Sequence, residues 1–198
     1  MREHEYETEI DTRLEGKLGF DRVRTFVADR CSTEYAVTRV TEERFSNDPK
    51  VIRERLALTD EMRLIVMFEE NFPTNGYIDC LDFLKPLEKT GYTIDILSLG
   101  KLRTMVETVR KLTNFFMSIK DGVYPNLKRM SAPVLSFPEV QRRIDQILDK
   151  FGDVKDTASD KLLEIRRAIK TKEGAISKRA NAILKQNPAD GLVEQDTA

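Results

Sequence analysis

Hydrophobic residues recur every three or four positions along most of the chain, and this spacing is typical of one face of an α-helix. The first such stretch begins near Phe20, in the segment GFDRVRTFVADRC. A second follows Asp48 and Pro49, a pair that favours a helix start because aspartate caps a helix and proline fits its first position. The positions expected on the buried side of this second helix are Ile52, Leu56, Met62, Ile65 and Val66.

The middle of the chain alternates breaks with further helical patterns. Pro73 and the Asn-Gly pair at 75–76 predict a turn, because asparagine and glycine both tolerate positive φ. A short helix is expected from about Leu81 to Lys89, and a longer one follows with Ser98 as its cap. After a stretch rich in glycine and proline, another helix is expected from about Glu139 to Lys150. Because no segment shows the sustained alternation of a strand, the expected fold class is all-α.

The last pattern is a long helix. Gly152 is expected to end the preceding helix, and Ser159 is the candidate N-cap of a helix that runs to about Asn187. Such a helix is about 40 Å long, which is more than a small core needs. Its hydrophobic residues recur every seven positions, which predicts a seam that packs against a partner helix. The predicted seam residues are Leu162, Ile169, Ile176 and Ile183.

Charge is distributed unevenly along the chain. The whole sequence has 33 basic and 34 acidic residues and a net charge of −1. The last helix has eight basic and three acidic residues, so its net charge is +5 and the remainder carries −6. One interpretation is a solvated helix with basic flanks, and the other is an arm that neutralises backbone phosphates. The candidate phosphate-facing residues are Arg167, Lys170, Lys178 and Lys185.

Composition excludes several classes of protein. The chain is 40% hydrophobic and 34% charged, and no run approaches the roughly 20 apolar residues of a membrane-spanning helix. Its first residues, MREHEYETEIDTR, are charged where a secretory signal is apolar, so we expect a cytoplasmic protein without a membrane partner. Cys31, Cys80 and His4 lie far apart, so the sequence predicts free thiols and no metal site.

Candidate catalytic motifs are weak. The Gly-Lys pairs at 16–17 and 100–101 lack the upstream glycine and the following Ser or Thr of a phosphate-binding loop. Glu69, Glu70 and Asp79 have no His or Cys partner motif beside them, so they are read as capping and surface carboxylates. We therefore assign no catalytic and no cofactor-binding residue, and we expect these 198 residues not to be an enzyme by themselves.

Four segments resemble, in order and spacing, the amino-terminal region of the MutS type II proteins. These are bacterial relatives of the mismatch-repair ATPase MutS that carry a carboxy-terminal Smr nuclease domain. The segments are KLGFDRVRTFVADRC, FEENFPTNGYID, YPNL and GDVKDTASDKLLEIRRAIK. The resemblance covers roughly residues 14–187, and its last segment is the most specific. Thr157 departs from the family, which often has asparagine at this turn.

The resemblance implies an all-α, multi-helix core domain with a long C-terminal lever helix, as in the MutS core/lever domain. It divides the chain into a flexible tail at 1–13, a core domain at 14–158, a lever helix at 159–187 and a truncated lead-in at 188–198. In this family the lever runs toward a DNA clamp. The seam would pack along the lever helix that returns after the clamp.

For the parent protein, the resemblance implies a homodimeric clamp that uses ATP and Mg, binds branched or distorted DNA, suppresses recombination and nicks DNA. The ATPase and nuclease sites would lie beyond residue 198, so this fragment is expected to be scaffold and lever, with no cofactor and no ATP turnover. Rescue of collided ribosomes is a second role of the family, and the chain does not distinguish a ribosomal partner from DNA. The remaining alternative is a purely structural helical interaction module.

Overall fold

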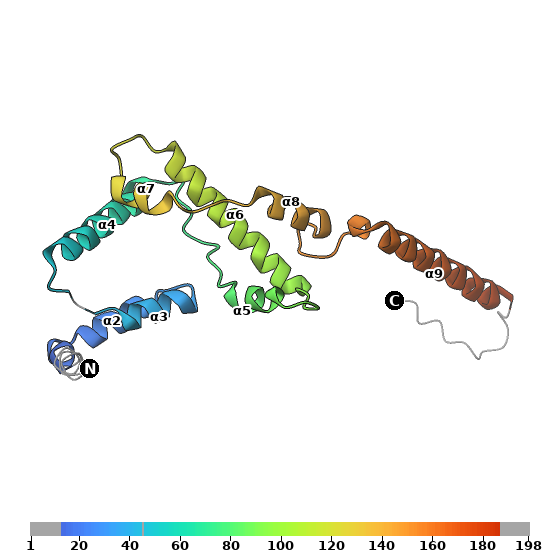
Figure 1. The fold of residues 1–198 in the computed structure, drawn as a ribbon. Coiled ribbons are helices and arrows are strands. Elements are labelled where there is room, and N and C mark those ends of the chain that lie inside the picture. Colours follow the sequence, from blue (N-terminus) through green and yellow to red (C-terminus); the bar gives the residue numbers. More distant parts are fainter. Residues whose placement is uncertain (1–12, 45, 187–198) are drawn as a thin grey trace. The chain divides into compact units, whose positions relative to one another are not determined.

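A computed structural model describes residues 13–44 and 46–186 of the chain (Figure 1). Within these ranges every regular element is helical, and the one extended pairing is a bridge between Leu148 and Val154. The all-α fold class is therefore confirmed. Apart from residue 13, the predicted tail at 1–13 lies outside the described residues, as does the lead-in at 188–198.

The chain forms two compact units, which we describe separately. The first unit runs through Ile144 and the second begins at Asp145. The predicted bounds of the core domain (14–158) and of the lever helix (159–187) stay predictions.

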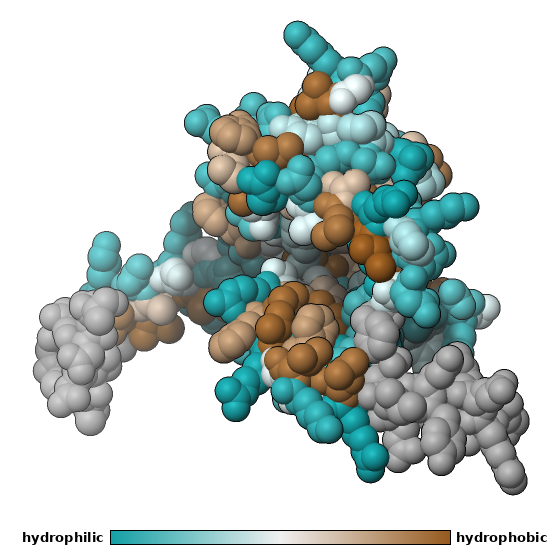
Figure 2. Space-filling view, turned by 90° about the vertical axis from the view of Figure 1, so that its left-hand side faces the viewer, coloured by the Kyte–Doolittle hydropathy of each residue, from teal (hydrophilic) through white to brown (hydrophobic). Residues whose placement is uncertain are grey.

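The first unit begins with a helical stretch at residues 13–18 and a pair of short helices, α2 (Phe20–Ala28) and α3 (Glu34–Glu42). The α3 helix starts where its cap residue, Thr33, accepts a hydrogen bond from the amide of Ala36 at 3.1 Å. Neither α2 nor α3 contains a fully buried residue. Figure 2 shows hydrophobic side chains gathered in the lower half of the drawn face, over these two helices.

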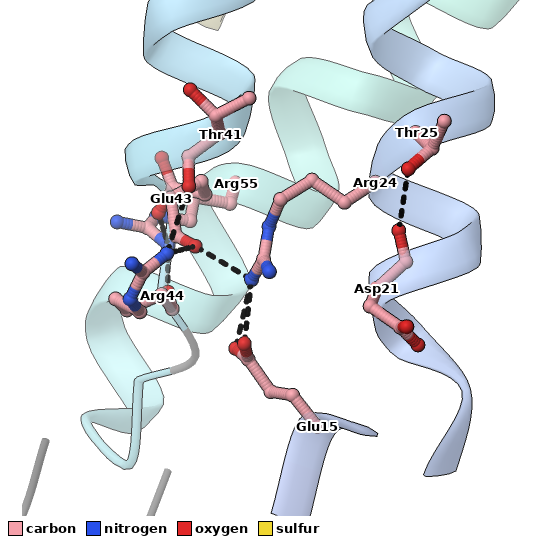
Figure 3. Close-up of polar contacts among 8 residues, drawn as sticks. All are labelled: Glu15, Asp21, Arg24, Thr25, Thr41, Glu43, Arg44 and Arg55. Carbon is pink, nitrogen blue, oxygen red and sulfur yellow. Dashed lines mark hydrogen bonds and ion pairs between the residues drawn. The ribbon is translucent and has the colours of Figure 1, made fainter. Parts of the chain in front are cut away.

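An ion pair between the mostly buried Arg24 and the buried Glu15 holds the start of the first unit together (Figure 3). The Arg24 guanidinium, on α2, donates to both carboxylate oxygens of Glu15 at 2.9 Å, and the same nitrogen donates to the Glu43 carbonyl at 2.9 Å. The side chains of Arg24 and Glu15 are only 14% and 7% exposed. Because a buried charge is costly unless it is paired, this contact fixes α2 against the segments that precede it and follow α3.

The α4 helix (Pro49–Phe68) begins as the sequence predicted, because Asp48 Oδ1 accepts a hydrogen bond from the amide of Lys50 at 2.8 Å. The predicted buried side is only partly correct. Ile65 is fully buried and Met62 packs against the core, but Ile52, Leu56 and Val66 are exposed. The prediction failed for these three residues because periodicity locates a face of a helix but not the part of it that another element covers.

The core of the first unit lies where α4 meets α6 (Ile96–Ser118) and α7 (Pro125–Ser131), as Figure 1 shows. Three phenylalanine rings stack edge to face there, with centroid distances of 5.1 Å for Phe72 to Phe115 and 5.2 Å for Phe115 to Phe116. This geometry suits aromatic rings because the positive ring edge meets the negative ring face. The cluster is completed by Ile65 and Leu127.

The segments between these helices agree with most of the expected turns. Gly76 has φ of 84° in the predicted turn, and α5 (Leu81–Leu84) with a 3₁₀ turn, η1 (Lys85–Glu88), occupies the expected short helix. The cap expected at Ser98 is wrong. Asp95 caps α6 instead, because its carboxylate accepts hydrogen bonds from the Ser98 amide at 2.9 Å and from the Ser98 hydroxyl at 2.6 Å.

The second unit starts within α8 (Pro138–Ile147) and continues through a tight turn, a 3₁₀ turn, η2 (Asp156–Ala158), and α9 (Asp160–Gln186). The α8 helix ends at Ile147, so the expected role of Gly152 as its C-terminal cap is wrong. Gly152, with φ of 92°, lies instead in the turn closed by the bridge between Leu148 and Val154. The Leu148 side chain is only 1% exposed.

Candidate interaction surface on the terminal helix

The α9 helix starts at the residue that the sequence predicted. The hydroxyl of Ser159 accepts a hydrogen bond from the amide of Leu162 at 3.2 Å, and Asp160 lies in the first turn, where a negative charge is favourable. The helix has 27 residues, which corresponds to about 40 Å. Its length therefore agrees with the helix expected from Ser159 to about Asn187, although Asn187 itself is outside the described residues.

The base of α9 is tied to the turn before it. Arg166 donates a hydrogen bond to the Val154 carbonyl at 3.2 Å and forms an ion pair with the Asp156 carboxylate. Lys155 Nζ donates to the Asp145 carbonyl at 2.6 Å, which joins the turn to α8. These contacts engage Arg166 within its own unit, so this residue is not available for a ligand.

The predicted seam forms one stripe along α9. Leu162 is half-buried near the base of the helix, whereas Ile169, Ile176 and Ile183 are 50%, 68% and 53% exposed. Exposed isoleucines at a repeat of seven are unusual on a helix that faces water, since a helical stripe of this kind normally packs on another element. The structure brings the four residues into line and leaves the three isoleucines exposed.

The seam has only one well-defined apolar position per seven residues. Ile165 lies beside it near the base, and Ala180 and Leu184 lie beside it near the end, but Lys172 and Arg179 occupy the positions seven and fourteen residues after Ile165. A stable two-stranded coiled coil needs two apolar positions in each repeat. Because the second apolar position is not repeated along α9, the helix is poorly suited to strong self-pairing and favours a partner with a complementary surface.

The four candidate phosphate-facing residues are all exposed on α9. Among the described residues, no ion pair engages the side chains of Arg167, Lys170, Lys178 and Lys185. They do not converge on one point, because they spread over about 18 residues, or roughly 27 Å, of the helix. Such a row suits an extended polyanion better than a single phosphate group.

A groove in the first unit was not anticipated from the sequence. It has a volume of about 960 Å³ and lies among the start of α3, residues 77–84, α6 and residues 134–140. Its lining is mostly apolar and includes Leu84, Met105, Val109 and Phe137. No local sequence pattern could have found it, because the four segments lie far apart in the chain.

The described part of the chain contains no group of three or more His, Cys, Asp or Glu side chains arranged to hold a metal ion. Cys31 and Cys80 are free thiols, and burial raises the pKa of the Cys80 thiol, as does nearby Asp79. None of the described helices is long and apolar enough to cross a membrane.

The fold and the exposed terminal helix define an all-α protein of the core-and-lever type. No protein-family model matches the chain. It is, however, similar to the protein named Endonuclease MutS2 in Listeria innocua, with 24% identity over 93% of this chain and 24% of the relative. The Geobacillus protein of the same name gives the same values, and the one from Clostridium perfringens is 26% identical over 90% of this chain and 23% of the relative.

These similarities confirm the resemblance to the MutS type II proteins that the four sequence segments indicated. The chain spans about a quarter of the length of the curated relatives that it matches.

Proposed function

We propose that the chain is the amino-terminal core and lever fragment of a longer MutS2-type protein. In this proposal the helices before α9 are scaffold, and α9 is a lever whose seam packs against a helix from another part of the parent protein. The observation that carries the proposal is the exposed stripe on α9, since a solvated helix has no need of three aligned isoleucines.

The energy available from covering this stripe is substantial. Full burial of an isoleucine side chain stabilises by about 1.5–3 kcal/mol. Ile169, Ile176 and Ile183 are roughly half to two thirds exposed, so covering them would contribute about 1 kcal/mol each, or about 3 kcal/mol together. This is enough to hold a partner helix that is already tethered within the same protein.

The parent protein, in this proposal, is a homodimeric clamp that binds branched or distorted DNA and is driven by ATP with Mg. Its ATPase and endonuclease sites would belong to parts outside this chain, and these 198 residues would contribute no catalytic group. The support is the similarity to proteins named Endonuclease MutS2 together with the cationic character of α9. A lever so placed would couple the nucleotide state of the parent to its grip on DNA.

The coupling can be tested in the longer protein with two variants that place the same charge on opposite faces of α9. Ile176→Asp puts an unpaired charge into the seam, whereas Thr171→Asp puts it on the opposite face. We expect the ratio of affinities for a four-way DNA junction with and without ATP to be the same in the parent and in Thr171→Asp, whose added charge lowers both affinities equally, and to fall to one in Ile176→Asp. Binding of branched and linear DNA with equal affinity, or unchanged coupling in Ile176→Asp, would contradict the proposal.

A further inference from the structure

We infer that α9 itself contacts the phosphate backbone of duplex DNA, through the side that faces away from the seam. The contacting side chains are Arg167, Lys178 and Lys185, which we call the far row. The inference rests on the proposed function, because the seam must be covered by a helix for the two sides of α9 to have separate roles.

The helical geometry separates the basic residues into two rows. At about 100° per residue, Arg167, Lys178 and Lys185 lie roughly 170–190° from the mean direction of the seam. A second set, the flank row, lies only about 50–70° from it. The flank row consists of Lys161, Lys172 and Arg179. Lys170 lies between the rows, at about 110°.

The two rows have different surroundings when the seam is covered. Flank residues border the seam, as the e and g positions do in a coiled coil, where charges pair with those of the partner helix. Far-row residues point away from any such partner and remain in solvent. They alone can approach a large ligand without a clash with the covering helix.

Few acidic residues on the far side of the helix compete for these cations. Asp160 and Glu164 lie on this side in the first turns of α9, but from Ile165 to Lys185 the only acidic residue is Glu173, and it lies on the seam side. Among the described residues, the far-row side chains form no ion pair, in contrast to Arg166, which Asp156 neutralises. Beyond Glu164 the far side therefore carries a net positive charge, and this is the condition that attracts a polyanion.

The side chains that lie between the far-row residues are short, so the helix surface there is recessed relative to the arginine and lysine side chains. The residues there are no larger than asparagine, namely Thr171, Gly174, Asn181 and Ala182. A Cβ atom added at Gly174 would meet no other atom within 4 Å, so the surface is also open. A phosphate backbone could lie close to the helix while the long arginine and lysine side chains reach it from the edges.

The spacing suits a backbone rather than a base sequence. Arg167 and Lys185 are about 27 Å apart along the axis, roughly eight base-pair rises of DNA. Arginine and lysine that contact phosphates position a protein without reading sequence. We therefore expect three phosphate contacts with no sequence preference.

The salt dependence of DNA binding by the longer parent protein, in which a helix covers the seam, tests this inference. The variant is Arg167→Gln, Lys178→Gln and Lys185→Gln combined, and the matched control is Lys161→Gln, Lys172→Gln and Arg179→Gln combined. Both triple variants remove one arginine and two lysines from the same helix. Fluorescence anisotropy with a 30-base-pair duplex between 50 and 200 mM salt gives the slope of log affinity against log salt, and circular dichroism confirms that each variant stays helical.

We expect the far-row variant to lose about 2.7 from the magnitude of this slope, since each phosphate contact contributes about 0.9. Between 50 and 200 mM salt, the affinity of the wild-type protein for DNA should therefore fall by a factor about 40 times larger than that of the far-row variant. The control should keep the wild-type slope. An equal loss in the control, a wild-type protein that does not bind the duplex at 50 mM salt, or tighter binding to duplex RNA of equal length would overturn the inference. The lever role would survive each of these results, because hydrogen exchange along α9 tests the covering of the seam without DNA.

Discussion

Glu61 provides the sharpest test of how the scaffold is held together. It lies on α4 and is only 9% exposed, and its carboxylate accepts hydrogen bonds from the first turn of α7. One oxygen accepts hydrogen bonds from the Asn126 amide at 3.1 Å and from Asn126 Nδ2 at 2.6 Å, and the other accepts from the Leu127 amide at 2.8 Å. The residue at the cap position of α7, Tyr124, makes no capping hydrogen bond with its side chain. Glu61 therefore caps α7 from another helix.

The cost of removing this carboxylate follows from the groups that it leaves behind. A buried amide without an acceptor costs about 1–3 kcal/mol, and this applies to Leu127. The two Asn126 donors are only partly buried, so water can replace their acceptor at a cost of about 0.5–1 kcal/mol each. Glu61→Ala should thus lower the free energy of unfolding by about 3 kcal/mol, which corresponds to roughly 6–12 °C in Tm.

Urea unfolding followed by circular dichroism measures this loss, and Glu54→Ala is the matched control. Glu54 lies on the same helix and pairs with Arg129 at 3.2 Å, but both side chains are exposed, so its removal should cost less than about 1 kcal/mol. Glu61→Gln should fall between the two, since the amide keeps one acceptor oxygen. If Glu61→Ala is within 1 kcal/mol of Glu54→Ala, the cap between the helices does not exist in solution.

Two further predictions concern single residues. Gly76→Ala should destabilise the chain by about 2 kcal/mol more than Gly91→Ala in thermal unfolding, because both have positive φ but only a Cβ at position 76 would lie 2.3 Å from Thr108 Oγ1. Hydrogen bonds from Ser98 lower the pKa of Asp95 below its ordinary 3.8, so the contribution of this cap is complete above about pH 4 and is lost as pH falls through the lowered pKa. Carboxyl chemical shifts in an acid titration would contradict this if Asp95 titrates at or above 3.8.

Local sequence patterns predicted the features that depend on neighbouring residues. Asp48 with Pro49 and the cap at Ser159 were found because a cap and its helix lie within four residues of each other. Asp95 was missed because two polar residues three positions apart can each begin a helix, and sequence does not say which one does. The exposure of Leu56 was missed because burial depends on where other helices lie.

The interaction surface on α9 was likewise only partly predictable from local sequence patterns. The seven-residue repeat located the seam and its alignment along α9, since both follow from the regularity of one helix. The engagement of Arg166 by Asp156 could not be predicted, because it depends on the fold of the turn before the helix. The capping of α7 by Glu61 joins residues 65 positions apart, and the apolar groove is built from four separate segments. No pattern within a short window contains such contacts.

Hydrogen exchange along α9 tests the central claim, that the seam is built to receive a helix from elsewhere in the parent protein. In the isolated, monomeric chain we expect weak protection from Ala175 to Lys185 and strong protection in α6, because the distal seam has no cover and Gly174 weakens that half of the helix by about 1 kcal/mol. In the longer protein the same amides should become protected in the wild type and in Thr171→Asp, but not in Ile176→Asp. Protection of Ala175 to Lys185 equal to that of α6 in the isolated monomer would contradict the account and show that α9 packs on its own chain.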